Sequence, residues 1–147
     1  ASDVYKRQGR SAAVALVALD KGPQLCDTYG QPVMDQLHCF VGNQWKKHYD
    51  TPMHQVVCRL TGSIFVVGSV DTTGPQLAAR MQELYEQMPH ECITTTGMMH
   101  RVQFTMSGAA AGLDEVEAKN WPALYELCDA RLRKVQASGG DRIGCAE

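Results

Sequence analysis

The strongest hydrophobic pattern in the chain has the helical period and lies between Thr73 and Pro89. Apolar residues recur there at spacings of three and four, with polar residues between them, as on a helix with one buried face. Thr73 and Gln76 have the spacing of a capping box, and Pro89 ends the pattern. We predict a helix over about residues 75–88. Its apolar stripe consists of Leu77, Met81, Leu84, Tyr85 and Met88.

Two further segments show the same period. The first segment predicts a helix over about residues 31–48. It contains Pro32, which suits the first turn of a helix. The other follows Asn120, a good helix cap, and ends at Ser138-Gly139-Gly140, after a short helical piece over residues 113–119. The two stripes are Val33, Leu37, Phe40, Val41 and Trp45, and Trp121, Leu124, Tyr125, Cys128, Leu132 and Val135.

The remaining ordered segments read as two β-hairpins. Residues 54–60 and 64–70 are rich in Val and Ile and flank Thr61-Gly62, and residues 91–95 and 98–106 flank Thr96-Gly97. Simple pairing in the first hairpin sets His54, Val56, Cys58, Leu60, Phe65 and Val67 on one buried face. In the second it buries Met98, His100, Val102, Phe104 and Met106 with Ile93, and turns His90, Cys92, Arg101 and Gln103 to the other face.

This order of elements, α-ββ-α-ββ-α, predicts an α+β fold. We expect a two-layer sandwich with a four-stranded, mainly antiparallel sheet and helices packed on one face. The apolar run of residues 12–19 reads as a short strand or helix. Residues 1–10 are expected to be a non-native or disordered leader, since residues 1–8 resemble translated adapter sequence at the edges of assembled environmental reads. Residues 11–147 then form one domain.

Composition and charge exclude several functional classes. The chain has 147 residues, of which 44% are hydrophobic and 20% charged, so it is an ordinary globular sequence. Its net charge of −2 and its interspersed signs argue against a nucleic-acid partner. No segment has the run of ~20 apolar residues that a membrane helix needs. We therefore expect neither nucleic acid nor membrane as a partner.

The six cysteines are widely spaced and several lie on apolar faces. We expect them to be mostly reduced and structural, which favours the cytoplasm over secretion. A disulfide-bonded, secreted protein with an incomplete N-terminus is the alternative.

Two groups of residues are candidates for chemistry. His90 and Cys92 share a strand face, and the predicted pairing sets Arg101 opposite Cys92, where a cation would lower the pKa of the thiol. Cys92 is therefore the candidate catalytic nucleophile, with His90 as its base. An ordinary exposed strand pairing explains the same three residues without catalysis.

The second group is a candidate metal site. His54, Cys58 and His100 lie on the predicted buried faces of the two hairpins, where imidazole and thiolate could bind a transition metal. Structural histidines, or a register slip of one residue that points them to solvent, are the alternative. No motif in the chain indicates a cofactor: the glycine loops that bind phosphates and the spacings of zinc sites are absent from the sequence.

These observations do not assign a specific activity. The absence of a catalytic signature favours a small binding or protein-interaction module that self-associates as a homo-oligomer, with a small molecule or a protein as its partner. The alternative is a small enzyme or a metal or thiol site that uses His90 and Cys92, or His54, Cys58 and His100.

Overall fold

The centre of the molecule is a five-stranded sheet. The structure, a computed structural model, describes residues 11–49, 55–95 and 97–144. The strand order is β2-β3-β1-β6-β7, antiparallel except for the parallel pair β6 and β7. The strands are β1 (Ala12–Leu19), β2 (Gln55–Thr61), β3 (Ile64–Val70), β6 (Met106–Gly112) and β7 (Arg142–Gly144).

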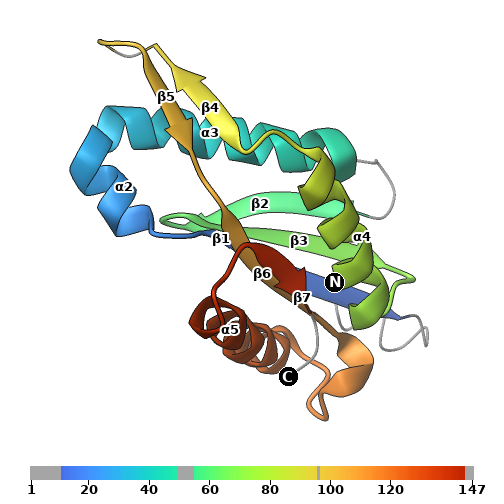
Figure 1. The fold of residues 1–147 in the computed structure, drawn as a ribbon. Helices are drawn as coiled ribbons and strands as arrows, with labels where there is room; N and C mark the ends of the chain where they lie inside the picture. The colour runs from blue at the N-terminus through green and yellow to red at the C-terminus, as the bar shows by residue number, and fades with distance from the viewer. Residues whose placement is uncertain (1–10, 50–54, 96, 145–147) are drawn as a thin grey trace.

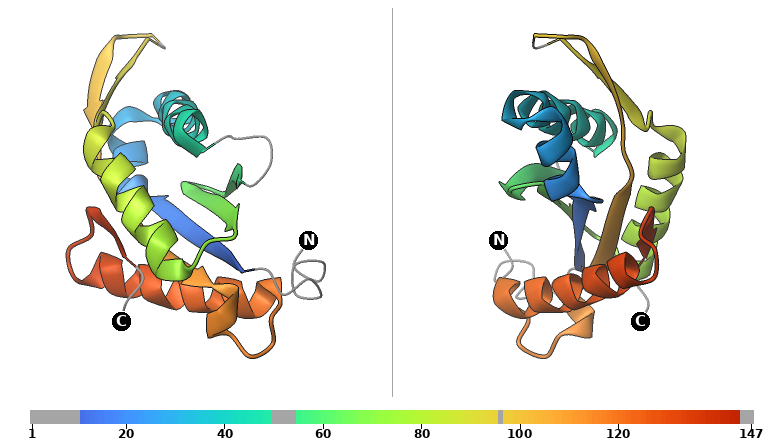
Figure 2. Two further views of the ribbon diagram at one scale, coloured as in Figure 1. Left: turned by 90° about the vertical axis from the view of Figure 1, so that its right-hand side faces the viewer. Right: turned by 60° about the vertical axis from the view of Figure 1, so that its left-hand side comes forward.

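Helices cover the sheet. Helices α3 (Gln31–Tyr49) and α4 (Gly74–Gln87) pack together on one face, which confirms the predicted α+β class, while α5 (Trp121–Ala137) lies across the other face (Figure 2). A shorter helix, α2 (Gly22–Tyr29), leads from β1 into α3, and a 3-10 turn, η1 (Leu113–Glu115), follows β6. None of these helices is both long and apolar enough to cross a membrane.

The central strand β1 explains why both faces need cover. Its side chains alternate between two cores: Val17 and Leu19 belong to the core under α3 and α4, and Leu16 and Ala18 to the core under α5. All four are buried, with at most 5% of their surface exposed. The apolar run of residues 12–19 is therefore a strand that is buried on both sides, a position that favours continuous rather than alternating hydrophobicity.

The second predicted hairpin does not join the main sheet. Strands β4 (Glu91–Thr94) and β5 (His100–Gln103) form a separate two-stranded ribbon that projects from the body of the molecule (Figure 1). The segment that was predicted as one strand over residues 98–106 divides, so that β5 belongs to the ribbon and β6 begins at Met106 in the sheet.

The register of this ribbon also differs from the prediction. Cys92 lies opposite Val102, and Arg101 lies opposite Ile93 instead of Cys92. The pairing is shifted by one residue, which exchanges the two faces of a strand. As a result Cys92 is buried, whereas Ile93 and Met98 are 54% and 76% exposed.

Among the cysteines whose side chains the structure describes, four carry free thiols: Cys26, Cys39, Cys92 and Cys128. Cys92 and Cys128 are buried, and burial raises the pKa of both thiols, that of Cys128 to about 12. These two cysteines therefore act as small apolar groups at neutral pH.

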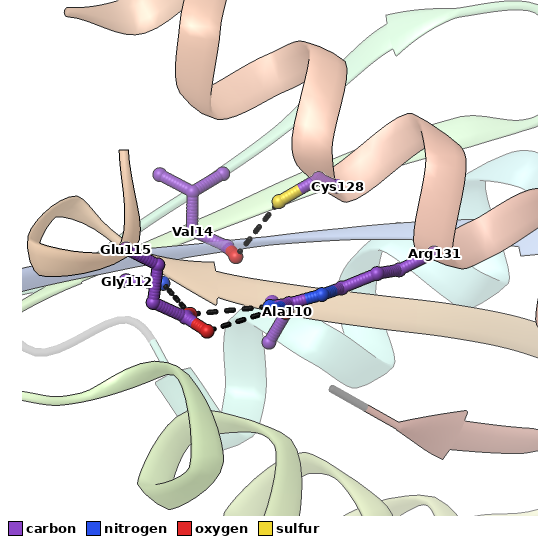
Figure 3. Close-up of polar contacts among 6 residues, drawn as sticks. All are labelled: Val14, Ala110, Gly112, Glu115, Cys128 and Arg131. Atoms are coloured by element: carbon purple, nitrogen blue, oxygen red, sulfur yellow. Dashed lines mark hydrogen bonds and ion pairs between the residues drawn. The ribbon is translucent and has the colours of Figure 1, made fainter. Parts of the chain in front are cut away.

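A partly buried ion pair fastens α5 to the sheet. Arg131 on α5 donates from Nη1 to the carbonyl oxygen of Ala110 on β6 at 3.0 Å and from Nη2 to Oε1 of Glu115 at 2.8 Å (Figure 3). Oε2 of Glu115 also accepts from the backbone N–H of Gly112 at 2.7 Å. The hydrogen bond from Arg131 is the main reason why the pKa of Glu115 lies below its ordinary value.

Replacing Arg131 by methionine should destabilise the domain by about 2 kcal/mol. This is below the ~3–5 kcal/mol expected for breaking a fully buried pair, because 28% of the Glu115 side chain is exposed. The matched control is Arg133→Met, which removes the exposed pair with Asp129 and should cost at most about 0.5 kcal/mol. Urea denaturation of both variants at pH 7 measures the difference.

The same pair predicts a pH dependence. The lowered pKa of Glu115 stabilises the fold above the ordinary carboxyl value of 4.5, and this contribution is lost as the pH falls through the lowered value. The stability gap between the wild type and Arg131→Met should therefore narrow on acidification below pH 4.5. A gap that is unchanged at low pH would contradict the assigned role of the carboxylate.

Candidate functional site

Four segments that are distant in sequence meet at one end of the central strands, around Asp20. This residue directly follows β1, and its carboxylate accepts hydrogen bonds from Thr105 Oγ1 at 2.7 Å and Ser107 Oγ at 2.5 Å. Its Oδ2 also accepts the backbone N–H of Asp141, at 3.1 Å. Asp20 thus ties the end of β1 to the start of β6 and to the loop between α5 and β7.

Close packing at this point requires Gly140. Its φ is +70°, and a Cβ atom there would lie 2.6 Å from Ser107 Oγ and 2.9 Å from Asp20 Oδ2. Both the backbone conformation and the contact exclude a side chain. The glycines that end α5 therefore also allow the loop to approach Asp20.

Tyr85 on α4 extends the same network. Its hydroxyl group donates to Oδ1 of Asp141 at 2.5 Å and accepts the backbone N–H of Met106 at 2.8 Å. Burial and the neighbouring carboxylate of Asp141 raise the pKa of Tyr85 well above its ordinary value, so the phenol stays protonated. The ring of His90 stacks on Tyr85 with ring centroids 4.4 Å apart, and its Nε2 lies 2.7 Å from the Tyr85 carbonyl oxygen.

A cavity of about 540 Å³ opens beside this network. Both charge signs line it: Lys21 contributes a cation, and Asp20 and Glu91 contribute carboxylates. Its apolar surface comes from Leu25 and Phe104, and its other polar groups come from His90, Gln103 and Thr105. Such a lining suits a ligand that combines an anionic group, hydrogen-bond donors and a flat apolar body.

The turn between β2 and β3 lies near the same end of β1. The backbone N–H of Leu19 donates to the carbonyl oxygen of Ser63 at 3.2 Å. Ser63 Oγ is 2.7 Å from Nε2 of His38 on α3, and Nε of Arg59 donates to the carbonyl oxygen of Gly62 at 2.6 Å. Burial, and next the charge of Arg59, lower the pKa of His38, so its imidazole is neutral at pH 7.

The structure separates the predicted catalytic residues. His90 lines the cavity, but Cys92 is buried and its pKa is raised. Arg101 forms an ion pair with Glu91 at 3.2 Å and lies opposite Ile93 in the ribbon, so the expectation that it faces Cys92 is wrong. A nucleophilic role for Cys92 stays a prediction that this geometry does not favour.

The predicted metal site can be located only in part. His54 and the side chain of Cys58 lie outside the residues that the structure describes. His100 is half-buried, with its ring 5.3 Å from that of Tyr29. Among residues 11–49, 55–95 and 97–144 no group of three His, Cys, Asp or Glu side chains is arranged to hold a metal ion.

Sequence reasoning missed Asp20, Lys21, Tyr85 and Asp141. The only local signal was an acidic residue directly after the apolar run of residues 12–19. Tyr85 was predicted correctly as part of a buried stripe, but nothing near it in sequence indicated that its hydroxyl group has two partners.

Comparison with known proteins identifies the family. Residues 1–142 match the family described as "Diguanylate cyclase, GGDEF domain", and the chain belongs to this family. No curated protein sequence matches the chain.

Similar solved structures show the same fold. The GGDEF domain of FimX from Pseudomonas aeruginosa is 20% identical, with a TM-score of 0.81 over 97% of this chain and 88% of its own. The GGDEF domain of DgcB from Caulobacter crescentus, in complex with c-di-GMP, is 17% identical, with a TM-score of 0.80 over 96% and 81%. The active GGEEF domain of a diguanylate cyclase from Vibrio cholerae is 15% identical, with a TM-score of 0.78 over 97% and 86%.

The family match corrects the functional expectation from sequence. A small binding or protein-interaction module that self-associates is not the class of this protein, because the match assigns it to the GGDEF domains of diguanylate cyclases. The pattern of apolar and polar residues did not lead to this result, because none of the motifs noted above selects one family.

The family implies a metal-dependent reaction, since transfer of phosphoryl groups from nucleotides is generally supported by Mg²⁺ held on carboxylates.

The string Gly-Gly-Asp-Glu-Phe, which the family name spells, does not occur in this sequence. The two nearest strings are Gly139-Gly140-Asp141-Arg142-Ile143 and Thr61-Gly62-Ser63-Ile64-Phe65, and neither has adjacent acidic residues. The carboxylates of Asp20 and Asp141 already accept hydrogen bonds. These residues do not fit a catalytic Mg²⁺ site, and no metal-dependent step follows from them.

Replacing Tyr85 by phenylalanine should destabilise the domain by about 2 kcal/mol, because it leaves the buried N–H of Met106 and the carboxylate of Asp141 without their partner. The control is Tyr125→Phe, at a half-buried position on α5, which should change stability by less than about 0.5 kcal/mol. Urea denaturation checks both. Equal effects of the two substitutions would show that the hydroxyl group of Tyr85 does not stabilise this junction.

Proposed function

We propose that this chain is a GGDEF domain that binds a guanine nucleotide in the cavity beside Asp20 and does not itself convert it into a cyclic dinucleotide. The cavity of about 540 Å³ carries the proposal, because its size is within the ~300–1,000 Å³ of small-molecule sites and its lining complements such a ligand. The DgcB domain, which shares the fold, is described in complex with c-di-GMP. That ligand defines the chemical class proposed here.

The lining supplies a group for each part of a guanine nucleotide. Lys21 is exposed at the rim, where an ammonium group suits a phosphate. Glu91 can accept from the N–H donors on the edge of guanine, because a carboxylate has about four acceptor positions and Arg101 and Gln103 donate only one hydrogen bond each to it. Phe104 and Leu25 provide apolar surface for the flat base.

We infer the loss of the cyclase reaction from the side chains at the β2–β3 turn, which are poor ligands for Mg²⁺. Ser63 and Ile64 occupy the β2–β3 turn in the nearest string that ends in phenylalanine, and neither side chain is a ligand of choice for Mg²⁺. The hydroxyl group of Ser63 is instead hydrogen-bonded to His38. We place the domain in the cytoplasm, where guanine nucleotides are available and free thiols such as Cys39 stay reduced.

Calorimetric titration with c-di-GMP and with GTP tests the site. We expect saturable binding of at least one of them, and Lys21→Gln should weaken it by at least about tenfold through loss of a charge-assisted contact. The control is Lys134→Gln, which removes a cation from the last turn of α5 that is not part of the cavity lining and should leave binding unchanged. Absence of binding by both nucleotides, or equal effects of the two substitutions, would refute the proposed site.

A product assay tests the second half of the proposal. Incubation with GTP and Mg²⁺ should yield no cyclic dinucleotide above a blank without protein, because the β2–β3 turn carries Ser63 and Ile64 in place of acidic residues that could bind the metal. The active GGEEF domain from Vibrio cholerae is the positive control that validates detection. Turnover by the wild-type chain would show that another set of residues performs the chemistry.

A further inference from the structure

Helix α3 lies over β2 (Figure 1). A second, smaller cavity is lined by residues of α3, β2 and β3. Its volume is about 230 Å³. The buried ring of Phe65 lines it, and a side chain at Gly42 would meet Cε1 of that ring at 3.2 Å. Glycine at this position therefore keeps the cavity open toward the ring.

The lining of this cavity is basic. Lys46 on α3 and Arg59 on β2 contribute two positive charges from opposite walls, and none of the described residues that line the cavity is acidic. Arg59 uses its Nε to bind the carbonyl oxygen of Gly62, which orients the side chain, and its guanidinium group carries four further N–H donors. Asn43 adds an amide group at the rim.

His38 is the most specific feature of the lining. The residue is 94% buried, since only 6% of its surface is exposed, and its Nε2 is held by Ser63 Oγ at 2.7 Å. Its Nδ1 is buried and has no hydrogen-bond partner among the residues that the structure describes. A buried polar atom of this kind normally has a partner. When Nε2 accepts from the Ser63 hydroxyl group, Nδ1 carries the ring proton and is a donor.

We propose that this cavity is an oxyanion site that binds a phosphate or pyrophosphate group between Lys46 and Arg59, with the ring of His38 in its wall. An anion would complement the two cations. The volume is below the range of whole nucleotide sites, so the bound group is a small anion or the phosphate portion of a larger ligand. The site is separate from the cavity beside Asp20 and does not depend on the function proposed for it.

Titration with sodium pyrophosphate tests this site, with isothermal calorimetry and amide chemical shifts as readouts. We expect saturable binding with a dissociation constant at or below about 1 mM. Lys46→Gln should weaken it at least about tenfold, and so should Asn43→Asp, which introduces a negative charge at the rim. Both positions are exposed on α3, so neither substitution should disturb the fold. The matched control is Lys47→Gln, which removes the neighbouring exposed cation outside the cavity and should leave binding unchanged.

Two further titrations identify the source of the anion. If the site holds the phosphate group of a nucleotide, GTP or c-di-GMP will displace pyrophosphate, and Lys46→Gln will weaken the nucleotide as well. If it holds free phosphate, pyrophosphate will bind equally with and without nucleotide. Lys21→Gln should leave pyrophosphate binding unchanged, which separates this site from the first cavity. No saturable binding, or binding that Lys46→Gln and Asn43→Asp leave unchanged, would overturn the proposal.

Discussion

The fold depends on the burial of β1 on both of its faces. Strand β1 pairs with β3 on one side and β6 on the other, and its side chains supply both cores. Helices must therefore cover both faces of the sheet, and α5 needs its own attachment, which the pair of Arg131 and Glu115 provides. The end of β1 is thereby held in place, so that Leu19 reaches the β2–β3 turn and Asp20 reaches Thr105 and Ser107.

Local patterns predicted most of the helical structure. The stripes that predicted helices over residues 31–48 and 75–88 correspond to α3 and α4, because an amphipathic stripe and its caps are contained within one segment. The apolar run of residues 12–19 stayed ambiguous, since a strand buried on both faces has no alternation to distinguish it from a helix. Helix α2 was missed because Gly22-Pro23 reads as a turn, although proline is also accepted in the first turn of a helix.

The candidate site could not be predicted in the same way, because its contacts join residues that are far apart in sequence. Thr105 and Ser107 are 85 and 87 residues from Asp20, and Asp141 is 56 residues from Tyr85. The prediction of the register between β4 and β5 was wrong for a related reason, because the contacts that set it lie outside the hairpin. The observed pairing differs from the predicted one by one residue, so that Cys92 lies in the core and Arg101 pairs with Glu91. The arrangement that a reactive thiol requires is therefore not present.

The residues that stabilise this domain are largely different from those that would perform its family's chemistry. Ser63 is half-buried at the β2–β3 turn, whereas Phe65 two residues later is 3% exposed and belongs to the core. The side chain of Ser63 is therefore not part of this core, and its hydrogen bond with His38 holds the turn against α3. The packing of the sheet thus does not depend on which side chain occupies position 63, and the basic cavity beside His38 lies where α3 and this turn meet.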